Sequence, residues 1–316
     1  MLSTLEILLP VFGLIFAGFV CRKRGLLGPT AASELNRFVV WLALPALLFD
    51  IMAHATWHQL YQPAFVATFA LSCAAVFVLI LAVRLLSGRH LADASVDAIA
   101  GSYPNTGYIG FPLCLIAFGP VSQTPTTIAT ILVACVLFAI AIVLIEVGLQ
   151  TERAPHRLVL KVVGSLARNP LIVAPIVGVL VASVHVTLPQ SAETFLKLLG
   201  GAASPCALVS LGLFLAEKRE GHAETAKPGA SLLLTGTKLL LQPALTWWLA
   251  ARVFSLSPLL VEMAVVLAAL PTGTGPFMLA DFYRREAHIT SRTILLSTVG
   301  SLVTLSLLLL FMPHGA

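Results

Sequence analysis

The chain has 316 residues, of which 58% are hydrophobic and only 10% are charged. Soluble domains carry about a quarter charged residues, so this chain has too few charges to cover its surface in water. The net charge of +5 does not indicate nucleic-acid binding, because the basic residues lie in short loops between apolar runs. The composition predicts an all-α polytopic membrane protein whose outer surface is covered by the lipid bilayer.

A membrane-spanning helix needs about 20 mostly apolar residues, and such runs recur along the whole chain. The ten expected spans cover residues 3–20, 33–54, 63–86, 95–118, 124–149, 166–185, 191–216, 231–253, 258–281 and 288–311. The first run is interpreted as a retained span. A signal peptide carries its basic residues before the apolar run, whereas here Arg22, Lys23 and Arg24 follow it.

Charge predicts the orientation of these spans. Of the 19 Lys and Arg residues, 16 lie after the odd-numbered spans, and Lys197 and Arg252 lie on the other side. Basic loops stay in the cytoplasm. We therefore expect a multi-pass protein of the cell inner membrane with both termini on the periplasmic side.

The spans divide into two blocks of five, residues 1–150 and 166–316, joined by a cytoplasmic linker at 151–165. An odd number of spans per block turns the second block upside down, as in the inverted repeats of transporters. Proline positions agree with this division. Pro45 in span 2 corresponds to Pro205 in span 7, and spans 4 and 9 each carry two prolines.

Spans 4 and 9 are predicted to be broken near their middles. The first break runs from Gly101 to Pro112 and the second from Leu270 to Pro276. Proline removes a helical hydrogen bond, and irregular backbone survives in a membrane only where protein or a polar cavity covers it. We expect the two breaks to cross at mid-membrane, with the crossover formed by Pro104, Gly107, Pro112, Pro271, Gly273 and Pro276.

Such a crossing would present free N–H groups at the starts of two half-helices, which favours binding of an anion. Asn105 and Thr272 follow the first proline of each break and are the leading candidates to donate hydrogen bonds to a substrate. Thr106, Thr274 and Tyr108 rank second. The alternative is that both breaks are ordinary proline kinks repaired by neighbouring helices.

Lys238 lies within span 8 and allows two interpretations. A charged group inside a membrane is usually functional, but a long lysine can also extend to the interface. Gln242, one turn later, would line the same region, and Asp281 at the end of span 9 is a weak candidate for proton coupling. The coupling ion would be H⁺ or Na⁺, and no cofactor is expected.

No motif indicates a metal site or an enzyme. His54 and His58 have a spacing that can bind metal, but no third ligand is evident, and the five cysteines lack metal-ligand spacing. The chain contains no Walker motif, so ATP-driven transport by this chain alone is excluded. An intramembrane enzyme, the first rival, would need a reactive constellation, and the sequence has no paired aspartates, HExxH or GxSxG.

Several motifs together resemble the auxin efflux carrier family, whose bacterial members include malonate-type transporters. They are Leu35–Phe38, Leu44–Phe49, Asn105–Pro112, Lys238–Pro243, Leu270–Pro276 and Ser297–Thr304. The motifs span nearly the whole chain. Thr272 stands where the plant carriers have asparagine, which favours a small aliphatic carboxylate over an indole acid.

The resemblance implies ten helices, with a scaffold domain of spans 1, 2, 6 and 7 and a moving transport domain of spans 3–5 and 8–10. It also implies an elevator-type motion and a homodimer formed through the scaffold. We therefore expect a secondary transporter of malonate or a similar carboxylate. The alternatives are a membrane receptor that binds a metabolite without moving it, and a carrier of a larger, auxin-like weak acid.

Overall fold

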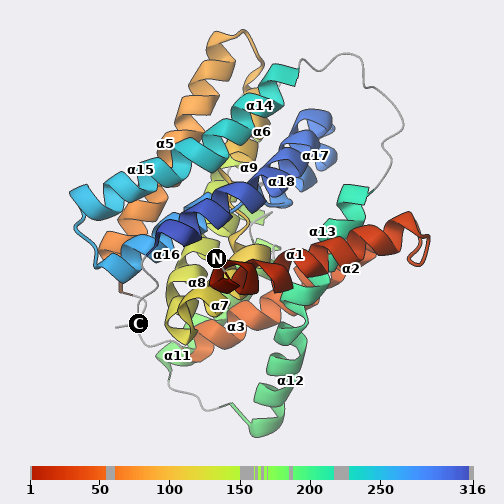
Figure 1. Cartoon of the computed structure of the whole chain (residues 1–316), viewed down its shortest axis with the longest axis vertical. Coiled ribbons are helices and arrows are strands. Elements are labelled where there is room, and N and C mark those ends of the chain that lie inside the picture. The colour runs from red at the N-terminus through yellow and green to blue at the C-terminus, as the bar shows by residue number, and fades with distance from the viewer. Residues whose placement is uncertain are drawn as a thin grey trace. The chain divides into compact units, whose positions relative to one another are not determined.

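The computed structural model describes residues 2–54, 61–149, 160, 163–164, 167–168, 170–184, 188–216 and 228–312. Within these residues the chain is helical, with no strand and one isolated β-bridge (Figure 1). His58 and most of the expected linker at 151–165 lie outside the described residues.

The helices coincide closely with the apolar runs. In the first half they are α1 (Leu2–Lys23), α2 (Ala31–Phe38), η1 (Val39–Ala43), α3 (Leu44–His54), α5 (Pro63–Leu86), α6 (Leu91–Ser102), η2 (Thr106–Gly110), α7 (Phe111–Phe118), η3 (Pro120–Ser122), α8 (Gln123–Ile131), η4 (Leu132–Leu137) and α9 (Phe138–Leu149). In the second half they are α11 (Pro170–Ser183), α12 (Gln190–Gly201), α13 (Ala203–Ala216), α14 (Pro228–Gly236), η5 (Thr237–Leu241), α15 (Gln242–Trp248), η6 (Leu249–Val253), α16 (Pro258–Ala269), α17 (Gly275–Phe282) and α18 (Ala287–Phe311). All the η segments except η3 are π-helical.

Five continuous helical segments among the described residues are long and apolar enough to cross a membrane. They are Ala31–His54, Pro63–Leu86, Pro120–Leu149, Gln190–Ala216 and Ala287–Phe311. Leu71, Val78, Val299 and Val303 on these segments are large, apolar and exposed, as expected for side chains that face lipid. The prediction of an all-α membrane protein is confirmed, whereas the count of ten spans stays a prediction.

The chain forms two compact units. Unit 1 comprises Met1–Gln62, Gly107–Thr127 and Ala167–Gly221, and unit 2 comprises Pro63–Thr106, Ile128–Leu166 and His222–Ala316. The boundary passes between Thr106 and Gly107. Consequently Gly107 and Pro112, which the sequence groups with the crossover, belong to unit 1, as does the substrate-binding candidate Tyr108.

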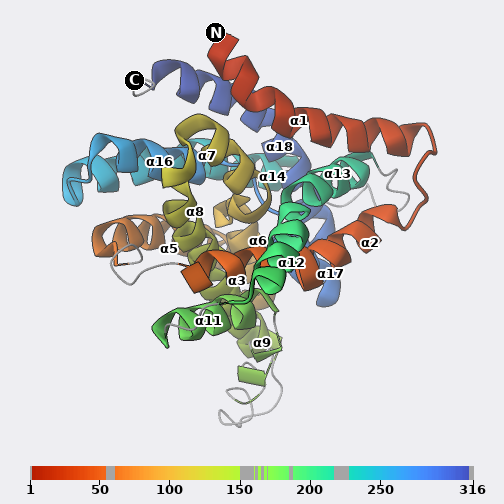
Figure 2. The same ribbon diagram turned by 90° about the horizontal axis from the view of Figure 1, so that it is seen from below.

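Unit 1 is built on two close helix pairs, α1 with α13 and α3 with α11; α1 lies alongside α13 in Figure 2. Glycine permits this approach because its missing Cβ lets backbones touch. A side chain at Gly18 would overlap the Val209 carbonyl, and one at Gly212 would overlap the Ile15 carbonyl. Gly178 approaches α3 in the same manner.

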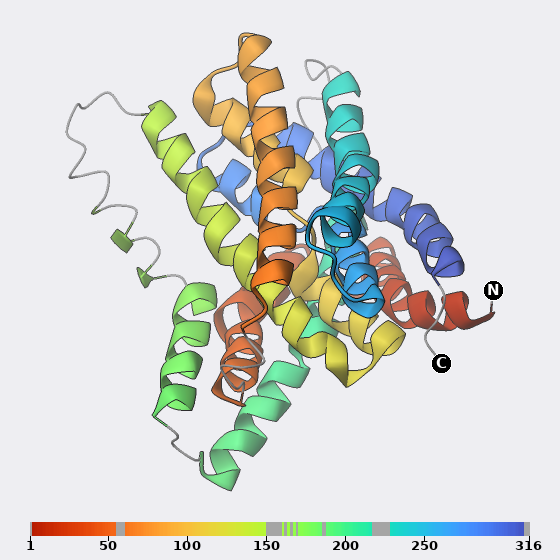
Figure 3. The ribbon, with the colours of Figure 1, turned by 90° about the vertical axis from the view of Figure 1, so that its left-hand side faces the viewer.

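In unit 2 the other helices pack around the two short helices α6 and α16. Helix α5 packs against α6 and α15, α6 packs against α9, and α14 packs against α18; α5 and α9 are drawn in orange and yellow-green in Figure 3. Helices α6 and α16 are buried along most of their lengths. Both end at the proline breaks, so the fold encloses the irregular backbone within protein.

Candidate functional site

The parts of the two breaks around Pro104 and Pro271 lie side by side in unit 2. The Asn105 N–H donates to the Pro271 carbonyl at 2.9 Å, and the Gly273 N–H donates to the Tyr103 carbonyl at 3.0 Å. Pro104 and Thr272 form an antiparallel bridge between these bonds. The breaks therefore satisfy each other's backbone groups.

The first break frees carbonyls at the end of α6, and side chains from elsewhere occupy them. Pro104 has no N–H to give to the Ala100 carbonyl four residues earlier, and the Thr272 hydroxyl donates there instead at 2.9 Å. The Ser102 carbonyl accepts from Gln242 Nε2 at 3.1 Å. Helix α6 thus ends on two neutral donors.

The second break frees the end of α16 in the same way. In a continuous helix the Thr272 N–H would reach the Ala268 carbonyl, but here it donates to Ser297 Oγ at 3.0 Å. The Ala268 carbonyl instead accepts from Lys238 Nζ at 2.6 Å. Lys238 is fully buried, so the alternative in which it extends to the interface is wrong.

Tyr103 is a site residue that the sequence analysis did not single out. Its ring lies against two glycines of the second break: a Cβ at Gly273 would stand 2.9 Å from Tyr103 Cε1, and one at Gly275 would stand 3.0 Å from Cζ. The ring also meets Phe138 edge-on, with centroids 6.3 Å apart. The closely spaced glycines were the available signal, since they often mark close approach of another group.

The structure brings together most of the predicted substrate-binding residues. Asn105, Thr106 and Thr272 are buried in unit 2, and Thr274 beside them is partly buried. Tyr108 lies in unit 1, where its hydroxyl donates to Asn36 Oδ1 at 3.1 Å. Because Thr272 already gives its hydroxyl hydrogen to Ala100, it holds the crossing in this conformation, and its role as a direct donor to substrate stays a prediction.

Two half-helices begin immediately after the breaks. Segment η2 starts at Thr106 and continues into α7, and α17 starts at Gly275. The first N–H groups of a helix lack intrahelical partners and carry the positive end of the dipole. In this chain the Thr106 N–H already donates to the Pro104 carbonyl at 2.8 Å, and the Phe277 N–H donates to the Thr274 carbonyl at 3.0 Å. Pro276 has no N–H to offer. Each half-helix therefore favours a carboxylate chiefly through the positive end of its dipole.

A buried ion pair lies one to two turns before the first break. Arg84 Nε of α5 donates to Asp97 Oδ2 of α6 at 2.6 Å, and Asp97 is fully buried. By its position in the sequence Arg84 belongs to the basic residues after span 3, and Asp97 is not among the predicted site residues. A single carboxylate in an apolar run does not indicate an ion pair in the sequence, because its partner Arg84 lies on another helix.

Polar contacts also join the loops after spans 3 and 9. Arg89 pairs with Glu286, and Arg285 Nη1 lies 2.8 Å from Asp93 Oδ1.

The side chain of Asp281, the predicted coupling acid, lies outside what the structure describes.

A third contact links the end of α9 to the segment after α17. The Tyr283 hydroxyl donates to Glu146 Oε1 at 2.7 Å. Burial, followed by the neighbouring Glu146 carboxylate, raises the pKa of Tyr283, so the phenol keeps its proton and continues to donate.

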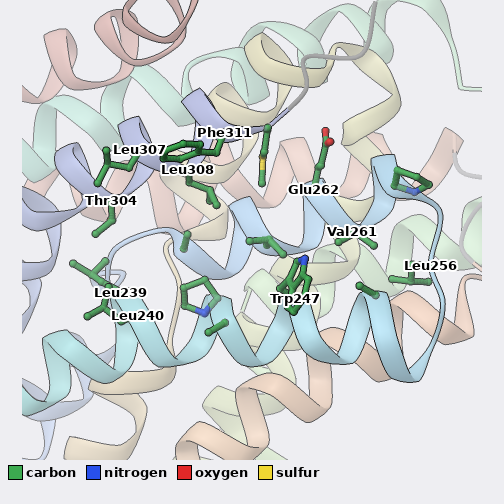
Figure 4. Close-up of a pocket in the computed structure, with 17 residues that line it drawn as sticks. Leu239, Leu240, Trp247, Leu256, Val261, Glu262, Thr304, Leu307, Leu308 and Phe311 are labelled. Carbon is green, nitrogen blue, oxygen red and sulfur yellow. The ribbon is translucent and has the colours of Figure 1, made fainter. Parts of the chain in front are cut away.

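A pocket of about 910 Å³ opens between α15, α16 and α18 (Figure 4). Its lining is apolar apart from a few groups such as Glu262 and Thr304. Neither Asn105 nor Thr272 contributes to it. A carboxylate would find almost no donors there, so the crossing is the better candidate for an anion.

Comparison with known proteins identifies the chain's relatives. A family model described as "Membrane transport protein" matches residues 3–309, and both bacterial and plant carriers are similar over nearly the whole chain. The chain belongs to the auxin efflux carrier family. The resemblance drawn from the motifs is thus confirmed.

Three members show the range of this family. The "Putative malonate transporter" of Rhizobium meliloti (strain 1021) is 30% identical, covering 98% of this chain and 96% of that protein. The "Uncharacterized transporter YfdV" of Escherichia coli (strain K12) is 24% identical over 94% of each chain. The "Auxin efflux carrier component 8" of Arabidopsis thaliana is 22% identical over 93% of each chain. As a member of the auxin efflux carrier family, the chain is a multi-pass membrane transporter.

Proposed function

We propose that this chain is a secondary transporter of a small organic carboxylate, malonate or a close analogue, working by alternating access. The observation that carries the proposal is the pairing of the two breaks, in which Asn105 bonds to Pro271 and Gly273 bonds to Tyr103. Broken helices that meet in this way are a characteristic binding element of secondary transporters.

The anion binds where the half-helices begin, with Asn105 at the centre and Thr106 and Thr274 beside it. Helix N-terminal ends attract negative charge through N–H groups and dipole. The resemblance to a protein named as a malonate transporter supports a short carboxylate, and the similarity to a plant auxin carrier supports an indole acid as the second candidate.

Transport proceeds by an elevator-type motion of a transport domain, made of spans 3–5 and 8–10, against a scaffold made of spans 1, 2, 6 and 7. The separation into two compact units supports this division, since unit 2 contains most of spans 3–5 and 8–10, including the stretches 103–106 and 270–274 that meet. The scaffold would also form the homodimer interface.

The basic loops face the cytoplasm of the inner membrane, and both termini face the periplasm. The contacts of Arg89 with Glu286 and of Arg285 with Asp93 support this topology. These two contacts join the loops after spans 3 and 9, which the charge pattern assigns to the cytoplasmic side.

Uptake into proteoliposomes tests the proposal. Purified protein should accumulate radiolabelled malonate or another short carboxylate against a gradient, and the panel should include an indole acid and set H⁺ and Na⁺ gradients separately. Saturable binding of a carboxylate without any uptake would instead identify a receptor. Neither uptake nor binding across the panel would reject the proposal.

A further inference from the structure

Lys238 is a fully buried basic residue whose ammonium nitrogen donates to a backbone carbonyl. It lies in the π-helical segment η5, and its Nζ is 2.6 Å from the Ala268 carbonyl oxygen. Among the residues that the structure describes, it forms no ion pair. Burying an ammonium without compensation is very costly, so the surrounding backbone must supply negative potential.

That potential comes from the C-terminal end of α16. The last carbonyls of a helix lack intrahelical partners and carry its negative pole. At this end Pro271 has no N–H, and the Thr272 N–H donates to Ser297 Oγ. The last carbonyls of α16 therefore cannot all find donors within their own helix. In secondary transporters the C-terminal ends of half-helices and unwound carbonyls hold coupling cations.

The C-terminal end of α6 has different hydrogen-bond donors. Gln242, one turn after Lys238 on the same helical segment, donates to the Ser102 carbonyl at 3.1 Å, and the Thr272 hydroxyl donates to Ala100. Both donors are neutral. One helical segment therefore contacts both half-helices, and it brings a basic side chain to α16 alone.

We infer that Lys238 is a tethered cation at the end of α16, occupying by covalent attachment the place where other carriers bind a coupling metal ion. The inference rests on the proposed function and deepens it. A permanently attached cation leaves no vacancy for Na⁺, so transport requires none. Removing the side chain down to Cβ creates a cavity with negative potential that a small ammonium ion fits.

The experiment compares wild type, Lys238→Ala and Lys238→Met in proteoliposomes and in detergent. Wild-type uptake should stay within twofold when Na⁺ is replaced by choline. Both variants should lose at least tenfold in uptake. Methylammonium should restore uptake of Lys238→Ala several-fold and raise its unfolding temperature, but should do neither for Lys238→Met, whose side chain fills the space.

Lys238→Met also controls for effects of methylammonium on the pH gradient, which would act on both variants alike. A strict Na⁺ requirement in wild type, or wild-type uptake by Lys238→Met, would overturn the inference. So would equal responses of the two variants to methylammonium. If wild type transports no carboxylate in any medium, the proposed function fails, and the thermal response of Lys238→Ala still decides the tethered cation.

Discussion

At the scale of residues, two prolines explain most of the polar contacts in unit 2. Each removes one N–H and turns the chain out of a helix, so carbonyls at Ala100 and Ala268 lose their usual donors. Thr272 and Lys238 provide replacements. Side chains that look isolated in an apolar sequence therefore have definite partners, and removing one leaves a buried polar group unsatisfied.

Asn105→Ala and Thr272→Val should each weaken substrate binding by about 1–3 kcal/mol, the typical cost of an unmade buried hydrogen bond. Thr272→Val keeps the shape of the side chain but leaves the Ala100 carbonyl without its donor. Isothermal titration with the transported carboxylate measures the change. Thr194→Val, at an exposed position of α12, is the matched control, and unchanged affinity in both site variants would contradict the proposed site.

Arg84→Met should destabilise the protein by about 3–5 kcal/mol, because it strands the fully buried Asp97 carboxylate without its partner. Thermal unfolding in detergent measures this loss. The double variant Arg84→Met/Asp97→Leu should recover most of it, since no buried charge remains. A double variant as unstable as the single one would show that the pair is not the cause.

At the scale of elements, the breaks act as one short antiparallel ribbon. Neither half of the ribbon could exist alone in a membrane, because each leaves N–H and C=O groups that only the other satisfies. The Tyr103 ring covers the glycines of the second break, so the ribbon needs small residues on one side. The spacing of proline and glycine is therefore a packing requirement as well as a source of flexibility.

Gly273→Ala should reduce uptake, because the new Cβ would lie 2.9 Å from Tyr103 Cε1 and force the ring to move. Overpacking of this kind costs about 1–3 kcal/mol. Gly229→Ala, where a Cβ meets nothing within 4 Å, should leave uptake unchanged. If Tyr103 transmits the effect, adding Tyr103→Leu to Gly273→Ala should cause no further loss, whereas additive losses would contradict this.

At the scale of the whole molecule, ion pairs connect segments nearly two hundred residues apart. Arg285 with Asp93 and Arg89 with Glu286 join the loops after spans 3 and 9 within unit 2. These groups are partly exposed, so each pair contributes little to stability. These contacts constrain the membrane topology, since loops that touch must lie on the same side of the membrane.

Cysteine labelling tests this topology in a background without the native cysteines. Ser87→Cys, after span 3, should react with an impermeant maleimide only from the cytoplasmic side. Ser257→Cys, between spans 8 and 9 and exposed, should react only from the periplasmic side. Labelling of both positions from one side would contradict the alternation of spans.

The amino-acid sequence by itself determined the all-α class, the approximate limits of most helices and the prolines, Pro104 and Pro271, at which two of them end. These properties depend on local hydrophobicity and on proline, which act within one helical segment. The run 63–86, for example, coincides with α5, and α6 and α16 each end two residues before a proline.

Only the tertiary structure decided which partner each freed carbonyl receives. Lys238 and Ala268 are 30 residues apart, Thr272 and Ala100 are 172 apart, and Arg84 and Asp97 lie on different helices. Hydrogen-bond partners are set by distance in space, and side-chain type alone leaves several donors equivalent. The sequence could therefore identify Lys238 as unusual, but only the fold showed that it meets the end of α16.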